Sequence, residues 1–116
     1  YPLRVKPGVR TVALTEYGGV AWPMPGHEPP NKTYGYGTAK DRHDLTSKYK
    51  KLQLETVLPQ LKNGLSALVY TQLTDVEDEV NGLFTYDRTE LKPDPTAIRS
   101  TNAALAAEFA RVIGEK

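Results

Sequence analysis

The chain has 116 residues, and its 15 Lys and Arg residues against 14 Asp and Glu residues give a formal net charge of +1. This balance excludes the cationic excess typical of a nucleic-acid-binding protein, and a composition of 39% hydrophobic and 25% charged residues excludes a disordered acidic tail. No apolar run approaches the roughly 18 residues of a membrane span, so we expect no membrane partner.

The sequence contains no cysteine and only two histidines, His27 and His43. Disulfides and thiolate metal sites are therefore excluded, and we expect neither a metal nor a cofactor. The lack of cysteine permits a cytoplasmic location but does not require one, and we favour that location. The chain begins with Tyr1 rather than Met and has no signal-peptide pattern, so we expect either a removed start or a piece of a longer protein.

Glycine and proline are concentrated near the start: six of the nine glycines and six of the nine prolines lie within residues 1–37. Within this region, the apolar and β-branched residues 11–15 predict a short strand that is buried on both faces. Residues 19–40 predict a long loop without regular structure, and such loops are often functional.

Residues 41–62 predict a helix, because apolar residues recur at helical spacing: Leu45, Tyr49, Leu52, Leu58 and Leu61. Asp41 is the expected N-cap and Gly64 the expected stop. Pro59 should kink the last turn or end the helix near Leu58.

Residues 65–73 predict a second buried strand, followed by an acidic loop at residues 74–82 and a short extended piece at residues 83–86. The last helix carries the clearest signals, with Asp94 as N-cap, Pro95 at the first helical position and Gly114 at the end.

The order strand, loop, helix, strand, loop, helix predicts a parallel sheet covered by helices, and hence an α/β fold. Two such units cannot make a stable closed sheet by themselves, so we expect them to belong to a larger barrel or doubly wound sheet. The long strand-to-helix loops indicate a ligand site at the carboxyl ends of the strands.

Glu16 follows the first predicted strand and precedes Gly18 and Gly19, a position from which a carboxylate can face substrate; the alternative is a surface glutamate. Gln72 and Asp75 follow the second strand and could line the same site. The four acids at positions 75, 77, 78 and 79 could instead bind calcium, although their spacing is not that of an EF-hand, or form a solvated loop.

Aromatic residues gather in the predicted loops and at strand ends: Trp22, Tyr34, Tyr36, Tyr70 and Tyr86. Aromatic faces stack on sugar rings, whereas the alternative for each residue is ordinary packing against a core.

Three stretches resemble glycoside hydrolase family 2, the β-galactosidase and β-glucuronidase group: TEYGG at residues 15–19, YGYG at 34–37 and VYTQLTDVEDEVNGL at 69–83, followed by YDR at 86–88. The resemblance covers roughly residues 9–113 and is to the end of the family's catalytic barrel. It implies that residues 1–116 form the carboxyl-terminal part of a TIM (β/α)8 barrel, namely strands seven and eight with their helices.

The resemblance also implies a function in carbohydrate metabolism, the retaining hydrolysis of O-glycosyl bonds in β-galactoside-like or β-glucuronide-like substrates. In that reading Glu16 is the nucleophile, Trp22 and Tyr36 are sugar platforms, and Gln72 and Asp75 line the pocket.

The family's acid/base glutamate follows an asparagine on strand four, and the sequence contains no Asn-Glu pair. We therefore expect the isolated chain to be inactive and its partners to be the carbohydrate substrate and the remainder of the barrel. Its unpaired strand edges favour self-association. The alternative function is that of a non-catalytic module that binds carbohydrate or calcium.

Overall fold

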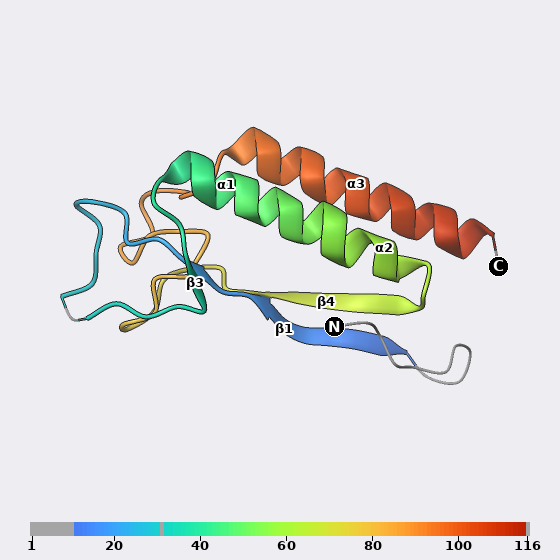
Figure 1. The fold of residues 1–116 in the computed structure, drawn as a ribbon, viewed down its shortest axis with the longest axis horizontal. Coiled ribbons are helices and arrows are strands. Elements are labelled where there is room, and N and C mark those ends of the chain that lie inside the picture. Colours follow the sequence, from blue (N-terminus) through green and yellow to red (C-terminus); the bar gives the residue numbers. More distant parts are fainter. Residues whose placement is uncertain (1–10, 31, 116) are drawn as a thin grey trace.

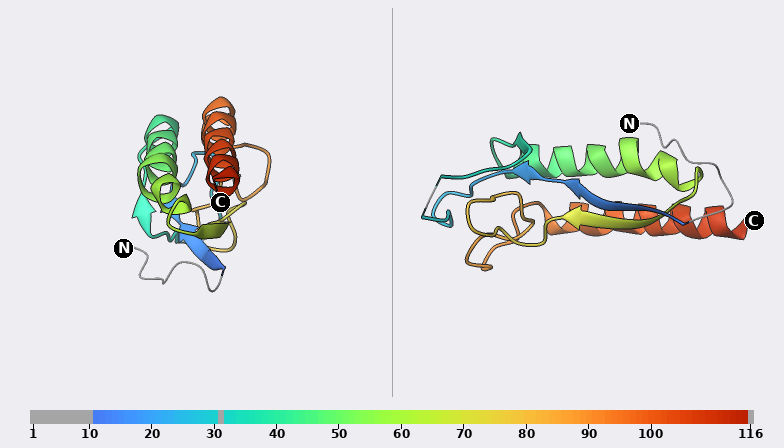
Figure 2. Two further views of the ribbon diagram at one scale, coloured as in Figure 1. Left: turned by 90° about the vertical axis from the view of Figure 1, so that its right-hand side faces the viewer. Right: turned by 90° about the horizontal axis from the view of Figure 1, so that it is seen from below.

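The computed structural model describes residues 11–30 and 32–115. It is a small mixed α/β structure in which two parallel strands, β1 (Val12–Gly18) and β4 (Leu65–Thr71), lie beneath two long helical rods (Figures 1 and 2). A second parallel pair is formed by β2 (Val20–Ala21) and β3 (Gly37–Thr38). The described residues contain two two-stranded sheets and no closed barrel.

The first rod consists of α1 (Arg42–Lys51), η1 (Leu52–Val57) and α2 (Leu58–Leu61) in direct succession. Asp41 caps it as expected, since its carboxylate accepts a hydrogen bond of 2.7 Å from the backbone N–H of Asp44. The second rod is α3 (Pro95–Gly114), whose N-cap Asp94 accepts from the backbone N–H of Thr96 at 3.1 Å. Both caps predicted from the sequence are confirmed.

Pro59 does not end the first rod. The helix continues to Leu61, and the irregularity falls just before the proline, where η1 is π-helical. The backbone N–H of Leu58 bonds to the carbonyl of Gln53, five residues earlier, in the wider turn of a π-helix. This wider turn accommodates a residue that has no N–H and would clash with a regular preceding turn.

The main hydrophobic core lies between the two strands and the rods, where Val57, Leu61 and Leu65 are buried. Val12, Leu14, Tyr17, Leu68 and Leu105 pack against this cluster. Only one face of the sheet is covered, and on β4 the side chain of Val69 is 55% exposed. The expectation that both strands are buried on both faces is therefore wrong for this chain, because the described residues provide helices for one face only.

The loop region at the carboxyl ends of the strands has more order than the sequence predicts. Residues 19–40 contain β2 and β3, and the backbone N–H of Ala39 donates to the carbonyl of Ala21 at 2.8 Å. A second cluster of Trp22, Ala39 and Leu45 is buried here, with Val20 and Met24 packed against it. The prediction that this segment lacks regular structure is wrong, since its ends close on each other and pair.

No helix in the described part of the chain is both long and apolar enough to cross a membrane.

Candidate functional site

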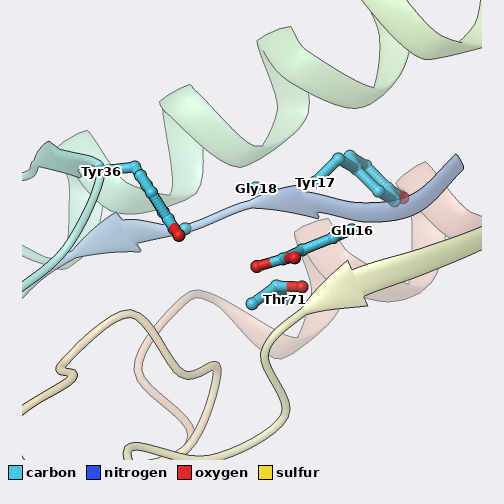
Figure 3. Close-up of a pocket in the computed structure, with 6 residues that line it drawn as sticks. Glu16, Tyr17, Gly18, Tyr36 and Thr71 are labelled. Atoms are coloured by element: carbon cyan, nitrogen blue, oxygen red, sulfur yellow. The ribbon is translucent and has the colours of Figure 1, made fainter.

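The carboxyl ends of β1 and β4 meet at one edge of the sheet, because the two strands run in the same direction. The backbone N–H of Gly19 donates to the carbonyl of Thr71 at 2.8 Å and joins the two ends. A cavity of about 260 Å³ lies at this edge, lined by Glu16, Tyr17, Gly18, Gly19, Tyr36 and Thr71 (Figure 3). The structure thus places a pocket where the strand-to-helix loops indicate one.

Glu16 lies in this pocket because β1 is bulged. Leu14 pairs with Leu68 and Tyr17 with Tyr70, so three steps along β1 match two steps along β4. Leu14 and Tyr17 both pack against the helical core as a result, and Glu16 is exposed on the other side. A bulge of this kind redirects a side chain and recurs next to active sites.

The turn after Glu16 depends on two glycines with positive φ, Gly18 at 103° and Gly19 at 75°. A Cβ on Gly18 would lie 2.5 Å from the ring of Tyr70, and one on Gly19 would lie 2.5 Å from the ring of Tyr36. Both the backbone conformation and the close approach of the rings therefore require glycine.

Tyr36 comes from the loop before β3 and is held over the glycine turn, since its backbone N–H donates to the carbonyl of Gly19 at 2.9 Å. Its ring meets that of Tyr34 edge to face, with centroids 5.7 Å apart, and both rings are more than half exposed. The negative charge of Glu16 raises the pKa of the Tyr36 phenol, with smaller contributions from Tyr34, burial and Glu79. The pocket thus joins a carboxylate to exposed aromatic surface, a combination suited to a polyhydroxylated ring.

Gln72 lies just beyond β4 in a polar network, and the peptide bond that precedes it is cis. Its amide Nε2 donates to Oε2 of Glu79 at 3.1 Å and to Oδ1 of Asn81 at 2.7 Å. Gln72 is thus placed near the pocket, although it does not line it. Glu79 in turn forms a β-bridge with Tyr34, so the network extends to the aromatic side of the site.

Asp75 lies in the interior, with 4% of its surface exposed. Its carboxylate accepts from Nζ of Lys92 at 2.7 Å and from the backbone N–H of Gly82 at 2.8 Å. Burial raises the pKa of Asp75 and lowers that of Lys92, while the ion pair opposes both shifts. The structure gives Asp75 a supporting role in the loops and does not bring it to the pocket lining.

Trp22 is also placed away from the pocket lining. Its side chain is 9% exposed and packs with Ala39 and Leu45. Its backbone carbonyl accepts a 3.0 Å hydrogen bond from Nζ of Lys92, and its backbone N–H donates to the carbonyl of Val80 at 2.9 Å. Of the two residues expected to be sugar platforms, Tyr36 reaches the pocket and Trp22 anchors the loops.

The acidic loop does not gather its carboxylates around one point. Among residues 11–30 and 32–115, no group of three or more His, Asp or Glu side chains is arranged to hold a metal ion. Asp75 is already neutralised by Lys92. The calcium alternative has no structural support within this part of the chain.

Sequence reasoning missed Thr71 and Tyr17 as pocket residues and did not connect Glu79 with Tyr36. The pairing of Thr71 with Gly18 follows from the parallel register and could have been expected once both strands were placed. The position of Tyr17 depends on the bulge, for which the sequence shows no pattern.

The chain matches no protein-family model, and no curated protein is similar enough in sequence to identify a relative.

Proposed function

We propose that the chain is the carboxyl-terminal part of the catalytic barrel of a family 2 glycoside hydrolase, corresponding to strands seven and eight with their helices. In the intact enzyme, Glu16 is the nucleophile of a retaining reaction on a β-galactoside-like or β-glucuronide-like substrate. The proposal starts from the resemblance of three sequence stretches. The observation that carries it further is the position of Glu16 in a pocket at the carboxyl end of a parallel strand.

The chemistry requires a carboxylate that is accessible to the anomeric carbon. Glu16 is exposed and lines the pocket, and Tyr36 supplies an aromatic face and a phenol beside it. In a retaining enzyme the carboxylate attacks the anomeric carbon as the bond to the leaving oxygen breaks and a general acid protonates that oxygen. Water then releases the sugar from the glycosyl-enzyme with the same group acting as base.

The flanks of the structure also suit a part of a barrel. An apolar hollow of about 260 Å³ lies between β1 and the first rod, with Leu14, Leu52 and Val57 in its lining. Another, of about 210 Å³, lies between β4 and α3 and includes Leu68 and Phe109. Each neighbouring strand–helix unit of a barrel would cover one of these surfaces.

The test uses the longer polypeptide that we expect the gene to encode upstream of Tyr1. It should contain an Asn-Glu pair at a strand end and hydrolyse an aryl β-galactoside or an aryl β-glucuronide. Glu16→Gln should lower kcat by about a thousandfold or more, because the nucleophile is lost. Glu55→Gln, which neutralises an exposed glutamate on η1, is the matched control and should leave kcat unchanged.

Full activity in Glu16→Gln would refute the proposal, as would an upstream coding region without barrel strands. Binding of sugar without hydrolysis, unchanged by Glu16→Gln, would instead support the non-catalytic carbohydrate-binding alternative. The exposed Tyr34 and Tyr36 rings are the feature that favours that alternative.

A further inference from the structure

Gln53 is an unusual residue for its position, because it is a polar side chain on the first rod with only 1% of its surface exposed. It belongs to η1, the π-helical segment. The hydroxyl of Tyr17 lies 3.1 Å from Oε1 and 3.0 Å from Nε2 of this amide. A buried amide is costly unless it is hydrogen-bonded, so this contact explains why glutamine is tolerated here.

Tyr17 is the residue at which the bulge of β1 ends. Strict alternation from Leu14 would turn Glu16 toward the helices and Tyr17 away from them, since side chains in a strand alternate with a period of two. The bulge reverses this arrangement. The ring of Tyr17 also packs edge to face on that of Tyr70, with centroids 5.5 Å apart, so the ring and the hydroxyl are held from two elements.

We propose that Gln53 is a positioning residue: by binding the Tyr17 hydroxyl it selects the bulged register of β1, which turns Glu16 into the pocket. The strand has two competing arrangements that differ in which of two neighbouring side chains faces the helices. Ring packing alone favours Tyr17 on the helical side. The amide of Gln53 adds a directional hydrogen bond to this arrangement. In the other arrangement that hydrogen bond would be lost, and the charged carboxylate of Glu16 would be buried against the helices.

The position of Glu16 can be measured through Tyr36. Tyr36 lines the same pocket as Glu16 and contacts the ring of Tyr34, and Glu16 is the main cause of the raised pKa of its phenol. In the 116-residue chain, an NMR titration of the ¹³Cζ signal of Tyr36 should therefore show a lower pKa, closer to 10.0, in Gln53→Met and in Tyr17→Phe. Tyr17→Phe keeps the ring packing and gives the same test if Gln53→Met does not fold.

Thr46→Val is the matched control, since it removes a hydroxyl on the same rod that accepts a 3.0 Å hydrogen bond from the backbone N–H of Asp94 and is bonded to neither Tyr17 nor Gln53. It should leave the Tyr36 titration unchanged. Equal shifts in all three variants, or no shift in Gln53→Met and Tyr17→Phe, would overturn the proposal. These outcomes do not depend on any enzymatic activity.

A second measurement rests on the proposed function. In the active parent, Gln53→Met and Tyr17→Phe should each lower kcat by about tenfold with KM little changed, and the double variant should be no worse than either one. Additive losses would mean that the two residues act separately and would overturn the pairing. Failure of the parent to hydrolyse glycosides would count against the proposed function, while the Tyr36 titration would still decide the role of Gln53.

Discussion

Lys92 joins the loops of the candidate site through the hydrogen bonds of its ammonium group, and replacing it tests how much these bonds contribute to the stability of the fold. Its ammonium group is fully buried and donates to Oδ1 of Asp75 at 2.7 Å, the carbonyl of Val80 at 2.8 Å and the carbonyl of Trp22 at 3.0 Å. These acceptors come from two segments that are far apart in the sequence. Lys92→Met keeps most of the side-chain volume and removes all three bonds.

The variant leaves a buried carboxylate without its cation, a change that costs about 3–5 kcal/mol. Small domains are stable by only about 5–15 kcal/mol, so the loss is a large part of the total. With a urea m-value of about 1.5–2 kcal/mol/M, the unfolding midpoint should fall by about 2 M. Trp22 is the only tryptophan of the chain, and its fluorescence during urea unfolding reports on this cluster directly.

The comparison variant is Lys92→Met combined with Asp75→Asn. Removing the charge of Asp75 while keeping an acceptor for the N–H of Gly82 should recover part of the lost stability, because an uncharged amide costs less to bury than a carboxylate. An unchanged midpoint in Lys92→Met would refute the reasoning. So would a double variant less stable than the single one, since it would mean that buried charge is not the source of the loss.

Three further predictions concern separate parts of the chain. Hydrogen bonds, the most important of them from the Thr85 hydroxyl, lower the pKa of Asp87 below its ordinary 3.8. The stability that these bonds contribute is present above pH 3.8 and is lost as the pH falls below it. Asp87→Asn should therefore flatten the acid side of a plot of thermal midpoint against pH. Gly18→Ala should cost about 1–3 kcal/mol in chemical unfolding, because its φ is positive and the added Cβ meets Tyr70; an unchanged unfolding curve would contradict this. Asp94→Ala should cost about 1 kcal/mol, seen by circular dichroism as a thermal midpoint lower by about 4 °C, whereas Asp94→Asn, which keeps a capping oxygen, should not.

The helices could be predicted from the sequence because their signals are local. The caps at Asp41 and Asp94 are hydrogen bonds to backbone N–H groups only a few residues further along the chain. The helical spacing of apolar residues requires only that one side of the helix faces the core. The parallel pairing of β1 and β4 followed from the alternation of strands and helices. The π-helical segment was not predicted, since Pro59 indicates an irregular turn near Leu58 but not that the irregularity takes the form of wider turns over Leu52–Val57.

The exposure of the strands was mispredicted for a physical reason. An apolar strand sequence indicates that both faces will be covered, but it does not say by what. The described residues provide two helical rods on one face (Figure 2). Val69 on β4 remains exposed. The same sequence is consistent with full burial once a barrel interior covers the second face, as the proposed function requires.

Some of the residues predicted for the site line the pocket and others are buried in the loops, and tertiary contacts decide which. Tyr36 lines the pocket, and its exposed ring is held there by a backbone hydrogen bond to the glycine turn. Asp75 and Trp22 follow strands in the same way, yet both are buried. The carboxylate of Asp75 pairs with Lys92, seventeen residues further along the chain, and the side chain of Trp22 packs with Ala39 and Leu45. Nothing in the acidic loop itself indicates which of its carboxylates will meet that cation.

Glu16 shows the limit of reasoning from strand periodicity most clearly. A period of two that starts at Leu14 would turn Glu16 toward the helices, where its charge would be buried against an apolar cluster, whereas the bulge turns it to the open edge. The cost of burying a charge therefore favours the bulge. In the bulged strand the hydroxyl of Tyr17 faces the helices, and the amide of Gln53 is its hydrogen-bond partner. The local pattern around residue 16 is consequently resolved by a glutamine 37 positions away, on a different layer of the structure.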